Sequence, residues 1–188
     1  MSNVYDLPPD LPRPLDEGAC NHLAGIKVPN IELEATTGGM ISLSDISRGA
    51  CVLFVFPRAG SPLEPNADQE LWDLTPGARG CTPQSCGFRD LFGEFKKVGY
   101  AVFGLSMQSP AVQREIVQRN EIPFPILSDR KYLFTDALDL PTFTFAGERL
   151  IKRMALIIRG GKIQKVFYPV FPPDKNAAEV LSWIINTN

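Results

Sequence analysis

Two continuously apolar stretches, residues 51–56 and 100–105, constrain the fold of this chain more than any other feature. Each has the pattern of a β-strand that is covered on both faces of a sheet. The segment between them carries apolar residues at helical spacing, namely Phe88, Leu91, Phe92, Phe95 and Val98. A strand, a helix and a second strand in this order predict a parallel pair joined by a right-handed crossover.

Weaker patterns complete an α/β architecture. Apolar alternation and turn residues predict strands at 31–35, 40–43 and 126–128 and helices at 109–120, 132–138 and 174–185. Two further apolar runs, 153–158 and 162–167, flank Gly160 and Gly161, which is the signature of a β-hairpin. The predicted fold class is therefore thioredoxin-like, with a central mixed β-sheet flanked by helices.

A chain of 188 residues has room for one ordinary domain. We expect that domain at residues 26–188, after a Pro-rich N-terminal extension over residues 1–25 that forms a loosely attached terminus or, as the alternative, a docking arm. An insertion near 61–74 interrupts the domain. It is either a surface excursion or a lid that carries Leu71 and Trp72, and Asn66 with Gln69 is a candidate capping box within it.

Composition excludes several functions. A net charge of −2 gives no basic field for a phosphate backbone, so the protein is not expected to bind nucleic acid. The single histidine, His22, disfavours His-rich zinc sites, Ser-His-Asp triads and Cys-His dyads. Four cysteines, no apolar run long enough to span a bilayer and no signal-peptide pattern predict a reducing intracellular compartment, the cytoplasm or alternatively the nucleus.

The chemistry concentrates at Cys81 and Cys86. Pro83 suits a first helical turn, which places Cys81 at a helix N-terminus, where the helix dipole favours a thiolate. In an unbroken helix these two Cα atoms stand about 8.7 Å apart, beyond the roughly 7 Å that a disulfide spans. A bond between them therefore requires the first turn to unwind, as in a redox switch. The alternatives are two buried thiols without a role and, with less support, a zinc site.

The other two cysteines have weaker signals. Cys51 begins the first core strand and is expected to be a packing residue. Cys20 lies in the extension, where nothing in the sequence supports a redox role.

The sequence resembles the peroxiredoxins, specifically the peroxiredoxin Q or bacterioferritin comigratory protein subfamily. The resemblance covers residues 28–185 and rests mainly on a Cys-Thr-x-x-x-Cys-x-Phe-Arg-Asp block at 81–90. Phe-Pro-Arg-Ala at 56–59 and Thr-Pro-Gly at 75–77 also match, with further support at 41–45 and 127–129.

This resemblance implies a thiol peroxidase that reduces hydrogen peroxide and organic hydroperoxides without a metal or organic cofactor. Cys81 would be the peroxidatic cysteine, and Cys86 the resolving cysteine that joins it in an intramolecular disulfide. Thioredoxin or a similar dithiol would reduce that disulfide. Arg153 matches the family's active-site arginine and Pro57 the proline that shields the pocket from water. The subfamily implies a monomer, with a dimer as the alternative.

One position departs from the family pattern, which has a Thr or Ser three residues before the peroxidatic cysteine. Ala78 stands there. Thr75 keeps the Thr-Pro-Gly context and is our choice as hydroxyl donor, whereas Ser61 keeps the spacing from Pro57. The altered spacing and the insertion leave open a peroxiredoxin-like enzyme specialised for another substrate. A helix that unwinds on oxidation leaves open a redox-gated binding protein.

Overall fold

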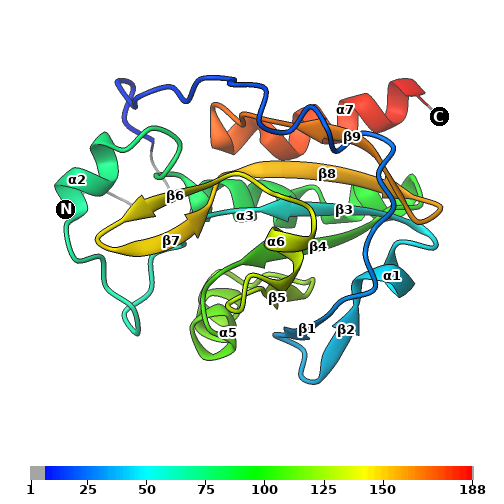
Figure 1. The fold of residues 1–188 in the computed structure, drawn as a ribbon, viewed down its shortest axis with the longest axis horizontal. Helices are drawn as coiled ribbons and strands as arrows, with labels where there is room; N and C mark the ends of the chain where they lie inside the picture. Colours follow the sequence, from blue (N-terminus) through cyan, green and yellow to red (C-terminus); the bar gives the residue numbers. More distant parts are fainter. Residues whose placement is uncertain (1–6, 188) are drawn as a thin grey trace.

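A seven-stranded mixed sheet forms the centre of the computed structural model, which describes residues 7–187 (Figure 1). The strand order is β2-β1-β5-β4-β3-β8-β9. These strands are β1 (Glu32–Ala35), β2 (Met40–Ser42), β3 (Ala50–Val55), β4 (Ala101–Ser106), β5 (Ile126–Ser128), β8 (Met154–Arg159) and β9 (Lys162–Phe167). A separate two-stranded sheet pairs β6 (Thr142–Phe145) with β7 (Glu148–Ile151).

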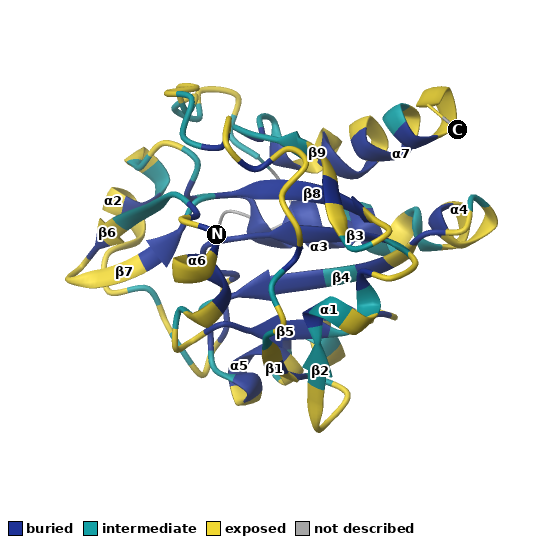
Figure 2. Cartoon of the chain, turned by 45° about the vertical axis from the view of Figure 1, so that its right-hand side comes forward, coloured by how far each residue is buried: buried dark blue, intermediate teal, exposed yellow. Residues whose placement is uncertain are grey.

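The strand register confirms the predicted crossover. β3 and β4 are parallel, with Cys51 opposite Ala101, and the helices between them carry the apolar side chains predicted to face the sheet. On its other side β3 pairs antiparallel with β8, and β8 turns through Gly160 and Gly161 into β9. Figure 2 shows β3, β4 and β8 buried along most of their length, as expected for central strands.

Each face of the sheet packs against its own hydrophobic core. On one face lie α3 (Cys81–Asp90), α4 (Phe92–Lys97), α5 (Pro110–Arg119) and α7 (Asn176–Thr187), which follows the 3₁₀ turn η1 (Pro173–Lys175). On the other face lie α1 (Leu43–Ile46), α6 (Leu133–Ala137) and part of the N-terminal segment. The alternation of side chains along β3 divides the cores, because Phe54 enters the first and Leu53 the second.

Three details differ from the sequence prediction. The helix before β4 is interrupted at Leu91, whose N–H caps the carbonyls of Gly87 and Arg89 and ends α3 before α4 begins. Ile185, an apolar residue on the helix predicted at 174–185, is exposed instead of packing in the core. The β6–β7 hairpin was not predicted at all. It turns through Ala146 and Gly147, both at positive φ, and its strands are only four residues long.

The described part of the N-terminal extension packs on the domain instead of hanging from it. In Figure 1 this segment, in blue, runs along the upper side of the molecule before it descends to β1. Cys20, Leu23 and Val28 are buried in the core beside α6. His22 Nε2 also lies 2.9 Å from the carbonyl oxygen of Leu138. Cys20 and Leu23 are therefore firmly attached to the domain, whereas residues 7–19 lie on its surface, exposed or partly buried. Residues 1–6 lie outside the described part.

The insertion forms a small third core with the β6–β7 hairpin. It contains helix α2 (Gln69–Leu74), whose N-cap is Asp68, because Oδ1 of Asp68 accepts from the N–H of Leu71 at 2.8 Å. The predicted capping box is wrong, since Asn66 bonds to the side chain of Gln69 and caps no backbone group. Trp72 is buried against Phe145 in an edge-to-face contact, with ring centroids 4.9 Å apart.

Candidate active site

Cys81 is the first residue of α3, as the position of Pro83 predicted. The preceding Gly80 has φ +104°, a left-handed conformation that glycine adopts without strain, and glycine has no side chain that could cap the helix. The first backbone N–H groups of the helix therefore remain available near the Cys81 sulfur. Together with the helix dipole they favour negative charge at this position.

Arg153 lies against that sulfur. Its Nη2 donates to Sγ of Cys81 at 3.2 Å, and both side chains are almost completely buried, at 3% and 2% exposure. Arg153 comes from the short link between β7 and β8, directly before Met154. The structure thus joins two residues 72 positions apart, as the sequence prediction required.

The guanidinium is held by main-chain oxygens of the turn before α3 and by an amide. Nη2 also donates to the carbonyls of residues 77, 78 and 79, at 3.2, 2.9 and 3.0 Å. Nη1 donates to Oε1 of Gln84 at 2.6 Å. Within residues 7–187, Arg153 has no ion pair with a carboxylate. Its positive charge therefore remains available to stabilise a thiolate at Cys81.

Gln84 is a site residue that the sequence analysis missed. It is fully buried, and while its Oε1 accepts from Arg153, its Nε2 donates to Oδ1 of Asn176 at 2.9 Å. Asn176 is the first residue of α7 and is also fully buried. The only sequence signal was a polar residue three positions after Cys81, on a helix turn that faces apolar neighbours.

A cavity of about 230 Å³ reaches Cys81 from the side of the insertion. Asn66, Gln69 and Trp72 form its wall on the insertion side. Arg58 and Arg79 also line it, and both form ion pairs, Arg58 with Glu148 and Arg79 with Asp73. The insertion therefore borders the approach to the thiol, which supports the lid interpretation, although Leu71 is exposed and does not line this cavity.

Cys86 lies on the same unbroken helix but in different surroundings. It is buried, at 7% exposure. Burial raises the pKa of Cys86. The charge of Arg89 lowers this pKa, and the charge of Asp90 raises it. All four cysteines are free thiols. A disulfide between Cys81 and Cys86 would therefore require α3 to open.

The remaining cysteines match packing positions. Cys51 is completely buried at the start of β3, and burial raises its pKa to about 12. For Cys20 burial and then the charge of Asp16 raise the pKa to about 12 as well. Neither thiol is activated in this structure.

The hydroxyl predicted for the site is absent from it. Thr75 is the C-cap of α2, and its Oγ1 donates to the carbonyl of Leu71 at 2.7 Å. Ser61 Oγ accepts from the N–H of Leu63 at 3.2 Å. Neither hydroxyl bonds to Cys81 within residues 7–187, so Thr75 as the hydroxyl donor is corrected. The sulfur instead lies 3.5 Å from the carbonyl oxygen of Ala78.

Pro57 lies two residues after the end of β3 and is buried. Across the described residues, no group of three or more His, Cys, Asp or Glu side chains is arranged to hold a metal ion. No helix in that part of the chain is long and apolar enough to cross a membrane.

A mixed sheet of this order, with a buried cysteine opening α3, defines the thioredoxin-like class of proteins. The Redoxin family model matches residues 23–181. The chain belongs to this family and, within it, to the peroxiredoxin Q and bacterioferritin comigratory protein group.

Three comparisons illustrate the relationship. The chain is 29% identical over 157 residues to peroxiredoxin Q, chloroplastic, of Oryza sativa subsp. japonica, covering 84% of this chain and 64% of the rice protein. It is 30% identical over 106 residues to a putative peroxiredoxin bcp of Coxiella burnetii, covering 56% and 59%. The crystal structure of peroxidoxin BcpB from Mycobacterium tuberculosis superposes with a TM-score of 0.71 at 26% identity, covering 89% of this chain and 99% of that one.

Proposed function

We propose that this protein is a thiol peroxidase in which Cys81 reduces hydrogen peroxide and organic hydroperoxides. The observation that carries the proposal is the 3.2 Å contact between Sγ of Cys81 and Nη2 of Arg153 at a helix N-terminus. Membership of the redoxin family supports it. Because the chain spans less than two thirds of the rice relative, that protein's name supports the activity without establishing it.

In the proposed first step the Cys81 thiolate attacks the terminal peroxide oxygen. An S–O bond forms as the O–O bond breaks, the sulfur is oxidised to a sulfenic acid, and the leaving oxygen takes a proton and departs as water or an alcohol. The guanidinium of Arg153 stabilises the thiolate before attack and the negative charge that moves onto the leaving oxygen. Its charge is permanent near neutral pH, so this step needs no metal and no imidazole.

In the second step the Cys86 thiolate attacks the sulfenic sulfur of Cys81. The S–O bond breaks, hydroxide leaves and is protonated to water, and an S–S bond joins the two cysteines. Helix α3 must unwind over its first turn for the sulfurs to meet. Thioredoxin or a similar dithiol then reduces the disulfide by thiol exchange and becomes oxidised itself.

Both cysteines belong to one helix, so the proposed cycle needs no residue from a second subunit, which supports a monomeric enzyme. Cytoplasmic localisation remains a prediction of the sequence.

A second candidate function is reduction of a particular peroxide in preference to hydrogen peroxide. Its support is the wall that Asn66, Gln69 and Trp72 form beside Cys81 and the unpartnered Oδ1 of Asn66. An acceptor at this wall would favour an organic hydroperoxide whose organic part carries a hydrogen-bond donor in addition to the peroxide O–H. Turnover of hydrogen peroxide at least as fast as that of every organic hydroperoxide tried would remove this candidate.

The proposed activity is tested by peroxide consumption with thioredoxin and its reductase as the electron source. We expect Cys81→Ser to abolish turnover, and Cys86→Ser to allow a single turnover that leaves a sulfenic acid trappable by dimedone. The matched control is Cys51→Ser, which removes a buried thiol outside the site. Turnover by Cys81→Ser at the wild-type rate would refute the proposal.

A further inference from the structure

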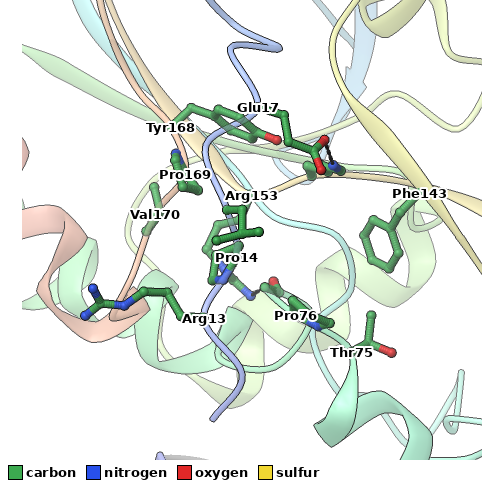
Figure 3. A pocket seen from close by; sticks show the side chains of 13 residues that line it. Arg13, Pro14, Glu17, Thr75, Pro76, Phe143, Arg153, Tyr168, Pro169 and Val170 are labelled. Atoms are coloured by element: carbon green, nitrogen blue, oxygen red, sulfur yellow. Dashed lines mark hydrogen bonds and ion pairs between the residues drawn. The ribbon is translucent and has the colours of Figure 1, made fainter.

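A second cavity, of about 340 Å³, lies beside Arg153 and does not include Cys81 (Figure 3). Three segments far apart in sequence border it: residues 13–17 of the N-terminal extension, residues 75–77 and residues 168–170. Phe143, Lys152 and Arg153 complete the lining. Figure 3 shows Phe143 on the right, Pro14 and Arg153 near the centre, and Pro169 and Val170 on the left. The volume lies within the range of small-molecule sites.

Most of the cavity wall is apolar. Phe143 and Val170 contribute side chains, and Pro14, Pro76 and Pro169 contribute rings that lose little conformational entropy when a ligand binds. One end is polar, because Nζ of Lys152 lies 3.6 Å from Oε2 of Glu17, and Tyr168 lies beside this pair. The cavity therefore suits an apolar body with one polar group.

The charges around the cavity favour an anion. Arg13, Lys152 and Arg153 line it, and Glu17 is the one carboxylate among its lining residues. Arg13 lies 5.1 Å from the ring centroid of Phe171 and forms no ion pair with any residue from 7 to 187. The lining thus carries a net positive charge at an apolar surface, where electrostatic attraction is stronger than in bulk water.

From this geometry we propose that the cavity binds a small carboxylate with an apolar body, whose carboxylate lies at Lys152. The ligand is not the peroxide of the proposed reaction, because the cavity does not contain the Cys81 sulfur. Residues 13–17, which form one wall, also lie outside the family match at 23–181, so the site belongs to the extension of this chain.

The test is calorimetric titration of the full-length reduced protein with decanoate, octanoate and decanol, without peroxide. We expect one decanoate to bind per chain. Decanoate has two methylenes more than octanoate, and each of them should tighten binding about fourfold. Decanol, which has the same body without the charge, should bind more weakly than decanoate. No detectable heat with decanoate, or decanol binding as tightly, would overturn the proposal and leave the peroxidase assay unaffected.

Two pairs of variants locate the site. Lys152→Met should weaken decanoate binding about tenfold or more, whereas Lys175→Met, which removes the same charge outside the cavity, should not. Leu15 lines the cavity and is 75% exposed, so Leu15→Asp should leave the fold intact and weaken binding about fivefold through repulsion. Its control is Leu63→Asp, at 61% exposure in the insertion. Equal affinities within both pairs would place decanoate elsewhere and overturn the proposal.

Discussion

Nη2 of Arg153 donates to Sγ of Cys81 at 3.2 Å, and both side chains are almost completely buried. The same nitrogen contacts three carbonyl oxygens of the turn that leads into Cys81. The turn thus fixes the guanidinium without neutralising it, and the charge is directed at the sulfur.

Removal of this charge should slow the reaction with peroxide. We expect Arg153→Met to lower the second-order rate constant of Cys81 oxidation by about 10²- to 10³-fold, the usual effect of losing one preorganised donor. Stopped-flow measurement of single-turnover oxidation gives this rate constant directly. Arg48→Met, a change at a highly exposed arginine, is the control. A loss of less than threefold in Arg153→Met would contradict the role given to this side chain.

Gln84 should act as a positioning residue. Gln84→Met keeps the length of the side chain but removes the acceptor for Nη1 of Arg153 and the donor for Asn176. Because the guanidinium then loses a fixed orientation, the second-order rate constant of Cys81 oxidation by peroxide should fall. A merely structural role would lower thermal stability without lowering this rate constant. Gln118→Met, at an exposed glutamine on α5, should change neither.

Cys86 should ionise at higher pH than an ordinary thiol. Burial raises its pKa, so the neutral thiol predominates at neutral pH and the thiolate gains as pH rises. The measurement is absorbance at 240 nm during titration, as the difference between Cys81→Ser and the Cys81→Ser, Cys86→Ser double variant. Asp90→Asn removes a charge that raises this pKa, so the midpoint should move downward; an upward shift would count against the assignment.

The turn before α3 should be sensitive to a single methyl group. Gly80 has φ +104°, and a Cβ there would overlap Pro173 and approach Leu7 of the extension to 3.2 Å. Gly80→Ala should therefore reduce the free energy of unfolding by at least about 1–2 kcal/mol, from the left-handed backbone alone. Urea unfolding measures this change. Gly93→Ala in α4, where a Cβ meets nothing, should instead stabilise the protein by about 0.5–1 kcal/mol.

Sequence patterns predicted the central architecture because burial dictates composition there. The apolar stretches of β3 and β4 have one explanation, a doubly covered parallel pair, and Pro83 marked the helix that Cys81 begins. Arg153 came only from resemblance to a known family. Nothing in the local sequence around it indicates a partner 72 residues away.

The features that sequence patterns missed depend on contacts between distant segments. Gln84 bonds to the side chain of Asn176, which lies 92 positions further along the chain. The proline content of the extension shows that it is not helical but does not show where it packs. Thr75 was misassigned because the motif match took no account of helix α2, which ends there. The carbonyl oxygen of Leu71 at that helix end accepts the hydrogen bond of the Thr75 hydroxyl. The short β6–β7 hairpin has too few residues for its alternation to be recognised.

The central claim is that Cys81 is oxidised first and Cys86 then joins it. Intact-mass spectrometry of the reduced protein after one equivalent of hydrogen peroxide, followed by peptide mapping, tests it most directly. We predict the loss of two hydrogens, mapped to a disulfide between Cys81 and Cys86, and in Cys86→Ser the gain of one oxygen on Cys81. An oxygen on Cys86, Cys20 or Cys51 while Cys81 stays reduced, or a disulfide that excludes Cys81, would contradict the account.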